Sequence, residues 1–174
     1  MQHAIIPMDF SGLPGWRLRW GAAQLDICQQ GAQILSYWPD LELPPLIWLS
    51  PQAEYERGHS VRGGVPVCWP WFGDIQRNPL AVQQMTTDTA PFHGLARTLD
   101  WQLLSSRSDA EAVQLSLQLD ASQGLTHWPH AARVQLHISL GEQLTLRLEN
   151  HNLGTQPVAI SQALHTYFAV SDVR

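Results

Sequence analysis

The stretch Val113-Gln-Leu-Ser-Leu-Gln-Leu-Asp120 alternates apolar and polar side chains without interruption, and it decides the fold class. A period of two places the apolar residues on one face of a half-buried β-strand. The same alternation returns in residues 134–140 and 144–148, with Gly141-Glu142 between them as a tight hairpin turn. We therefore expect these last two segments to pair as antiparallel strands.

Further strand candidates lie on the N-terminal side of this region. They cover residues 16–20, 25–28, 34–38 and 101–104, and no segment has the pattern of a long amphipathic helix. Many short strands separated by turns are typical of a β-sandwich or barrel. Residues 39–80, rich in Pro, Gly and aromatics, and residues 121–132 read as loops, the first ordered and functional. We expect residues 1–174 to form one all-β domain.

Composition and charge exclude several classes of function. A net charge of −5 argues against nucleic-acid binding, which needs an extended basic surface. No apolar run approaches the roughly 20 residues that span a bilayer, and the N-terminus lacks the features of a secretory signal, so we expect a cytoplasmic protein without membrane contact. Cys28 and Cys68 are too few for a disulfide framework and are expected to be inert buried thiols.

Three short segments carry the candidate chemistry. The first is Ser60-Val-Arg-Gly-Gly-Val-Pro-Val-Cys-Trp-Pro-Trp-Phe-Gly73, the second Pro91-Phe-His-Gly-Leu-Ala-Arg97 and the third Ala163-Leu-His-Thr-Tyr-Phe168. Two glycines follow Arg62 and allow a sharp turn and the close approach of a ligand. Arg97 follows His93 by four residues, so one loop can present a cation and an imidazole to a small ligand. Guanidinium groups match phosphate oxygens, although structural salt bridges are the commoner role of an arginine.

In this order and spacing the three segments resemble the hexose-6-phosphate 1-epimerase branch of the aldose 1-epimerase (mutarotase) family, over essentially the whole chain. The resemblance implies a galactose mutarotase-like β-sandwich, or supersandwich, and an isomerase without cofactor that interconverts the α and β anomers of hexose 6-phosphates. It implies that Arg62 and Arg97 hold the 6-phosphate. It further implies that His165 protonates the ring oxygen as the acid and that His93 assists by hydrogen bonding to the sugar.

The aromatic and remaining histidine residues of the loops admit more than one interpretation. Trp71, with Trp69 and Phe72, is a candidate for stacking on the sugar ring, but tryptophans in a Pro-rich loop more often pack the edge of a core. His127 and His130 have no carboxylate or cysteine cluster to complete a metal site, so we expect no metal. For His165, a core position on a strand is the alternative to a catalytic role.

Members of the family continue past the position of Arg174, and their catalytic base is a glutamate from that later part. Neither Glu142 nor Glu149, in ordinary strand or turn contexts, matches this base. We therefore expect an N-terminal part of the β-sandwich that lacks the C-terminal strands. Removal of a positioned base costs on the order of 10² to 10⁴ in rate, so we expect little or no activity. Open sheet edges and apolar faces also predict self-association.

Three alternatives stay open. An epimerase for free aldoses would not need both arginines. A non-catalytic module that binds sugar phosphates would keep the pocket and lack the base. A zinc or cupin-type metalloprotein is the weakest of the three, because the histidine spacing does not support it.

Overall fold

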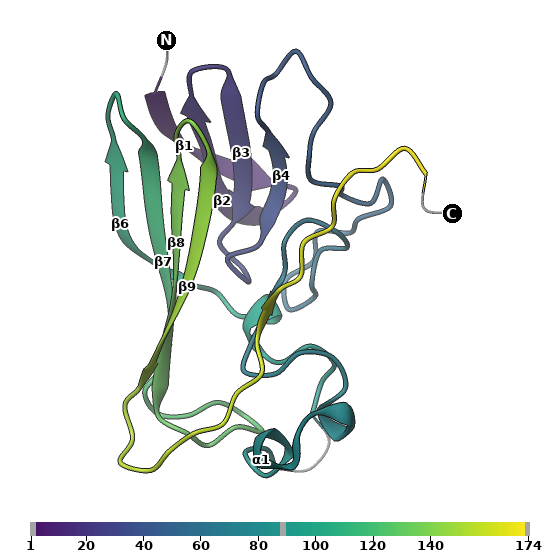
Figure 1. Cartoon of the computed structure of the whole chain (residues 1–174), viewed down its shortest axis with the longest axis vertical. Coiled ribbons are helices and arrows are strands. Elements are labelled where there is room, and N and C mark those ends of the chain that lie inside the picture. Colours follow the sequence, from purple (N-terminus) through teal and green to yellow (C-terminus); the bar gives the residue numbers. More distant parts are fainter. Residues whose placement is uncertain (1–2, 88–89, 173–174) are drawn as a thin grey trace.

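Two four-stranded antiparallel sheets face each other and a small third sheet lies beside them (Figure 1). The computed structural model describes residues 3–87 and 90–172. The first sheet has the order β1 (His3–Phe10), β2 (Leu13–Trp20), β3 (Ala23–Cys28) and β4 (Ile34–Trp38). The second has the order β6 (Gln102–Ser108), β7 (Val113–Ala121), β8 (Ala132–Leu140) and β9 (Leu144–Asn152). The third pairs β5 (Val67–Cys68) with β10 (Ala163–Leu164).

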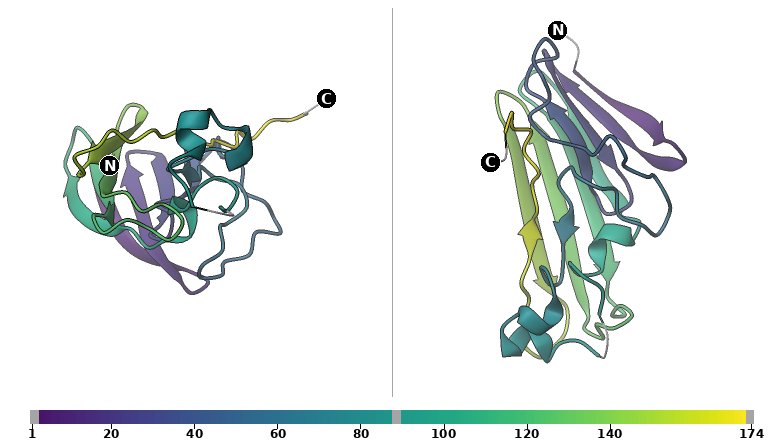
Figure 2. Two further views of the ribbon diagram at one scale, coloured as in Figure 1. Left: turned by 90° about the horizontal axis from the view of Figure 1, so that it is seen from below. Right: turned by 90° about the vertical axis from the view of Figure 1, so that its right-hand side faces the viewer.

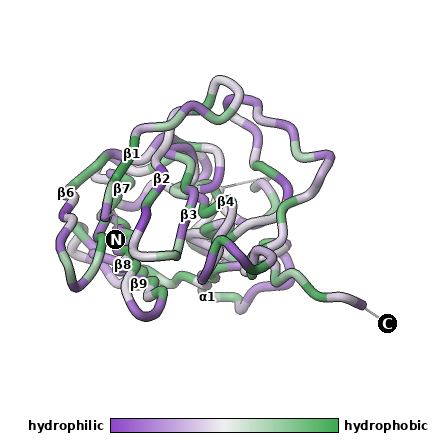
Figure 3. The backbone as a smooth tube through the Cα atoms, turned by 90° about the horizontal axis from the view of Figure 1, so that it is seen from above, coloured by the Kyte–Doolittle hydropathy of each residue, from purple (hydrophilic) through white to green (hydrophobic). Residues whose placement is uncertain are grey.

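The alternation in the sequence becomes the two faces of the second sheet. Leu117 of β7 lies opposite Leu136 of β8, which lies opposite Leu148 of β9. Leu117 and Leu136 are buried, whereas Gln114, a polar position of β7, is exposed. Figure 3 shows that hydrophobic and hydrophilic positions are interspersed along the backbone. The predicted pairing of residues 134–140 with 144–148 is confirmed.

The main core fills the space between the two large sheets. Leu18 and Leu25 from the first sheet belong to the same buried cluster as Leu115 and Val134 from the second. Trp101, which directly precedes β6, is fully buried among them, and its indole N–H donates to the carbonyl of Ala96. These contacts confirm an all-β sandwich in place of a barrel.

The structure differs from the expected elements in three places. Strand β1 was not predicted; Pro7 breaks its alternation, and an edge strand tolerates proline because one side of its backbone is unpaired. The hairpin turn between β8 and β9 contains Gln143 as well as Gly141 and Glu142. The chain between β5 and β6 also holds three short helices: η1 (Ile75–Arg77), α1 (Leu80–Gln83) and η2 (Ala96–Thr98). No helix in the described residues is long and apolar enough to cross a membrane.

After β9 the chain returns along the loops of residues 39–80, so that segments far apart in sequence lie side by side (Figures 1 and 2). The Trp48 N–H donates to the Tyr167 carbonyl at 2.8 Å, and the His165 N–H donates to the Pro66 carbonyl at 3.0 Å. This return path carries the third sequence motif to the first. It creates the candidate site.

Candidate active site

The second motif is tied to the first through closely spaced backbones. The Leu95 N–H donates to the Trp69 carbonyl at 2.8 Å, and a Cβ on Gly94 would lie 2.3 Å from that same oxygen. Gly94 has φ +75°, a conformation that side-chain-bearing residues rarely adopt. The peptide between Trp69 and Pro70 is cis. Glycine at position 94 therefore lets the His93 loop lie this close to the backbone of the first motif.

His93 is held at both its backbone and its ring. Its N–H donates to the Gly73 carbonyl at 2.9 Å, and its Nδ1 accepts the Gly73 N–H at 3.1 Å. Burial lowers the pKa of this imidazole, and the positive charges of Arg97 and His165 lower it further. His93 is therefore a neutral ring at neutral pH, and a neutral ring that accepts at Nδ1 carries its proton on Nε2.

His165 lies directly after β10 and faces His93. The two ring centroids are 5.5 Å apart with an interplanar angle of 69°. The ring of Tyr167 lies 4.7 Å from that of His165. Nδ1 of His165 is buried and has no hydrogen-bond partner in the described part of the chain. The tautomer of His165 is therefore not fixed by a hydrogen bond at Nδ1. This suits a group that must give and take a proton.

Arg97 brings a largely buried cation to the same place. Its Nη1 donates to the Ser60 hydroxyl at 3.1 Å and its Nη2 to the Phe92 carbonyl at 2.6 Å, while Nε has no partner among the described residues. Burial lowers the pKa of the guanidinium, which still stays charged at neutral pH. Within residues 3–87 and 90–172, no carboxylate forms an ion pair with it; the paired arginines are Arg17, Arg57, Arg107 and Arg147.

Arg62 is exposed on the loop that contains Ser60, the hydroxyl partner of Arg97. The two glycines after it both have positive φ, +105° at Gly63 and +71° at Gly64, as the sharp turn requires. A Cβ on Gly64 would lie 2.1 Å from the carbonyl oxygen of Ile34, so the loop is pressed against the first sheet. The structure thus brings His93, His165 and Arg97 together, with Arg62 on an adjoining loop.

The structure corrects the prediction for Trp71. Its side chain is fully buried, and its indole N–H donates to the Pro91 carbonyl at 3.0 Å. A buried ring offers no face to a sugar, so Trp71 packs the core, as the alternative interpretation held. Phe72 is the aromatic residue beside the histidines: it is 40% exposed and its ring lies 5.0 Å from His93 and 5.4 Å from His165.

A pocket of about 520 Å³ opens beside His93. Sequence reasoning did not assign Arg77, Asn78 or Ser161 to a site, and all three line this pocket with Phe72. No motif marks them, and Ser161 reaches the pocket only through the return path of the chain after β9. Asp74, the carboxylate of this pocket, accepts the Gln76 N–H at 3.0 Å and caps η1.

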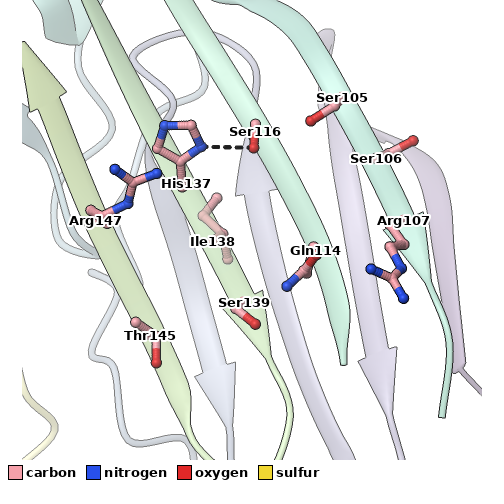
Figure 4. A pocket seen from close by; sticks show the side chains of 10 residues that line it. All are labelled: Ser105, Ser106, Arg107, Gln114, Ser116, His137, Ile138, Ser139, Thr145 and Arg147. Atoms are coloured by element: carbon pink, nitrogen blue, oxygen red, sulfur yellow. Dashed lines mark hydrogen bonds between the residues drawn. The ribbon is translucent and has the colours of Figure 1, made fainter. Parts of the chain in front are cut away.

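A second hollow, of about 510 Å³, lies on the outer face of the β6–β9 sheet and contains none of the predicted site residues (Figure 4). Apart from Ile138 its lining residues are polar, and Ser116 and Nδ1 of His137 form a 2.9 Å hydrogen bond across β7 and β8. A polar outward face is the usual counterpart of a buried one in an antiparallel sheet. This hollow is therefore explained by the sandwich itself.

The remaining candidates have structural roles. Nε2 of His130 contacts the Met85 carbonyl at 2.8 Å, and its ring packs on Trp128. The described residues contain no group of three or more His, Cys, Asp or Glu suited to a metal ion. Cys28 and Cys68 are buried free thiols, as predicted, and burial raises the pKa of Cys68 to about 11, far from the range of a reactive thiolate.

Solved structures of other proteins share the fold of this chain. The solved structure of a candidate mutarotase, YeaD, from Salmonella typhimurium matches 97% of this chain and 52% of its own, with a TM-score of 0.80 and 29% identity. A galactose 1-epimerase from Lactobacillus acidophilus shares the fold at a TM-score of 0.63 and 16% identity, covering 96% of this chain and 53% of its own. The fold of this chain is thus that of the galactose mutarotase-like proteins.

The family model for aldose 1-epimerase matches residues 16–174, and the chain belongs to this family. A candidate glucose-6-phosphate 1-epimerase from Escherichia coli K12 is 39% identical over 145 residues, which are 83% of this chain and 44% of that protein. A similarly named protein from Cenchrus ciliaris is 30% identical over 85% of this chain and 44% of its own length. The chain thus spans about half the length of the curated relatives that it matches.

Proposed function

We propose that this chain carries the histidine and phosphate-binding part of a hexose-6-phosphate 1-epimerase site. The observation that supports it most directly is Arg97, a largely buried guanidinium with no carboxylate partner in the described residues, beside His93. An unpaired buried cation is costly unless an anion arrives, and a phosphate fits its fork geometry. Arg62, on the adjoining loop, supplies the second cation.

The two histidines divide the acid–base work. His93, a neutral ring with its proton on Nε2, donates a hydrogen bond to a sugar oxygen. His165 protonates the ring oxygen, the C1–O bond to that oxygen opens, and rotation about C1–C2 followed by reclosure gives the other anomer. Proton transfer by a positioned residue contributes about 10² to 10⁴ in rate. Phe72 covers one side of both imidazoles.

The reaction also needs a base for the C1 hydroxyl, and we propose that it is not among the described residues. Asp74, which lines the pocket beside His93, is committed to the cap of η1. Glu149 contacts Arg147 and His151, which lie on the same strand, β9. The full reaction is therefore proposed for a protein that adds such a carboxylate to this pocket.

Binding separates a sugar phosphate from a free sugar. We expect glucose 6-phosphate to shift the ring signals of His93 and His165 in NMR titrations, and glucose to bind far more weakly. Arg97→Met should weaken binding of the phosphate about 10- to 100-fold, because it removes charged hydrogen bonds. Arg107→Met is the matched control, because Arg107 lies on β6, away from the site. It is 70% exposed and pairs with Asp109. Equal binding of glucose and glucose 6-phosphate would contradict the assignment.

Exchange NMR on freshly dissolved α-glucose 6-phosphate separates binding from catalysis. Phosphate-dependent binding without acceleration indicates a binding module that lacks its base. Acceleration that His165→Ala abolishes would place a base inside these residues and contradict our proposal for it.

A further inference from the structure

Three hydrogen bonds form a closed ring around the backbone of Phe72. The Phe72 N–H donates to the Ser161 hydroxyl at 3.2 Å, and the Ser161 hydroxyl donates to Oδ1 of Asn78. Nδ2 of Asn78 closes the ring by donating to the Phe72 carbonyl at 2.9 Å. Both polar groups of this one backbone residue are thus held by the same pair of side chains.

The amide side chain of Asn78 is suited to this place because it can donate two hydrogen bonds and accept one. Besides the Phe72 carbonyl, its Nδ2 also donates to the Asp74 carbonyl at 2.8 Å. Two carbonyl oxygens can only accept, so the group facing them must be a double donor, while the group facing Ser161 must accept. An amide meets both demands; a carboxylate or an alkyl group does not.

The residue next to Phe72 controls the histidine. Gly73, at φ +69°, points its N–H at Nδ1 of His93 and accepts the His93 N–H at its own carbonyl. A rotation of the Phe72–Gly73 peptide would turn this N–H away from the imidazole. The Nε2–H tautomer of His93 therefore depends on how firmly this turn is held.

We propose that Asn78 is a positioning residue of the site: through the hydrogen-bonded ring with Ser161 it fixes the turn that keeps His93 in its Nε2–H tautomer and Phe72 against both imidazoles. The catalytic role of Asn78 rests on the proposed function, in which His93 donates a hydrogen bond to the sugar and His165 transfers the proton. The structural part concerns the tautomer alone and can be tested without a substrate.

The test is a long-range ¹H–¹⁵N correlation spectrum of the histidine rings, recorded between about pH 5 and 8, the range in which histidine titrates. We expect His93 in the unaltered chain to show a single neutral form protonated at Nε2. In Asn78→Ala we expect a mixture of the two neutral tautomers and a rise in the apparent pKa of His93. Asn152→Ala is the matched control, because Asn152 also donates to a turn carbonyl, that of Gln156, at 2.8 Å.

A second pair of variants covers a failure of Asn78→Ala to fold. Ser161→Ala opens the ring at its middle member and should change His93 in the same direction, whereas Ser161→Thr keeps the hydroxyl and should restore the spectrum of the unaltered chain. A His93 spectrum that stays unchanged in Asn78→Ala or Ser161→Ala, or an Nδ1–H tautomer in the unaltered chain, would overturn the proposal. A chain that fails to bind sugar phosphates yet shows these spectral changes would contradict the proposed function instead.

Discussion

Gly94 is the residue on which the assembly of the site depends most directly. Gly94→Ala would place a Cβ 2.3 Å from the Trp69 carbonyl oxygen and 2.9 Å from that of Trp71, both backbone atoms with little freedom to move. The backbone strain alone costs about 1–3 kcal/mol at this φ, and the steric clash adds to it. We expect Gly94→Ala to lower the free energy of unfolding by more than this backbone strain alone, as measured by urea denaturation.

Gly58→Ala separates the two contributions. Gly58 has a similar φ of +83°, but a Cβ there would meet no atom within 4 Å. Its substitution should therefore show the strain alone. Equal losses in the two variants would mean that the His93 loop is not pressed against the first motif.

His93 also predicts how stability depends on pH. Its pKa in the folded chain is lowered, chiefly by burial, so the unfolded chain takes up this proton more readily than the folded one. Stability from this group is then complete above the ordinary value near 6.5 and is lost as pH falls toward the lower folded value. We expect the urea midpoint to fall more steeply on acidification in the unaltered chain than in His93→Asn. Asn is the chosen substitute because His93 has φ +65°, a conformation that Asn tolerates. Parallel pH profiles would contradict this assignment.

At the scale of elements, β7 provides a direct test of alternation. Leu117 is fully buried between the sheets, and Leu117→Ala should cost about 2–5 kcal/mol because it removes buried methyl groups and leaves a cavity. Gln114→Ala on the same strand faces outward and should change stability by less than about 0.5 kcal/mol. The comparison uses urea denaturation of both variants. Similar losses in the two would show that β7 is not half-buried in this register.

The first sheet contains a cross-strand pair that the alternation alone does not reveal. Arg17 of β2 lies directly opposite Asp26 of β3, and Nε and Nη2 of the arginine donate to the two carboxylate oxygens at 2.7 and 2.8 Å. The hydrogen bonds to Asp26 raise the pKa of Arg17. This two-point contact fixes the register between β2 and β3 in addition to the apolar contacts of Leu18 and Leu25.

At the scale of the molecule, apolar side chains remain exposed where the C-terminal segment meets residues 46–48. Trp48 is 36% exposed and Phe168 59% exposed, and the Ala169 N–H donates to the Leu46 carbonyl beside them. Contiguous exposed apolar surface favours association. We predict concentration-dependent self-association, measured by sedimentation velocity.

The double substitution Trp48→Ser and Phe168→Ser should weaken this association about tenfold or more, because it removes two large apolar side chains from the contact. Leu80→Ser is the control: Leu80 is 67% exposed but lies on α1. A chain that stays monomeric at all concentrations, or a double variant that associates as strongly as the unaltered chain, would contradict the prediction.

The sequence by itself determined the all-β fold class and identified the candidate residues of the site. Alternation between residues 113 and 148 specifies which faces are buried, because a period of two leaves each strand only one apolar face. The two glycines after Arg62 predicted a sharp turn, and both adopt positive φ. Local pattern sufficed for these features because each depends on neighbouring residues in the chain.

Only the tertiary structure decided which of these residues meet. Trp71 and Phe72 are adjacent in sequence, yet Trp71 is buried in the core and Phe72 lies beside two imidazoles. Asn78 and Ser161 carry no motif and acquire their role because the chain returns past the first motif after β9. Such contacts depend on the long-range path of the backbone, which no local pattern of side chains encodes.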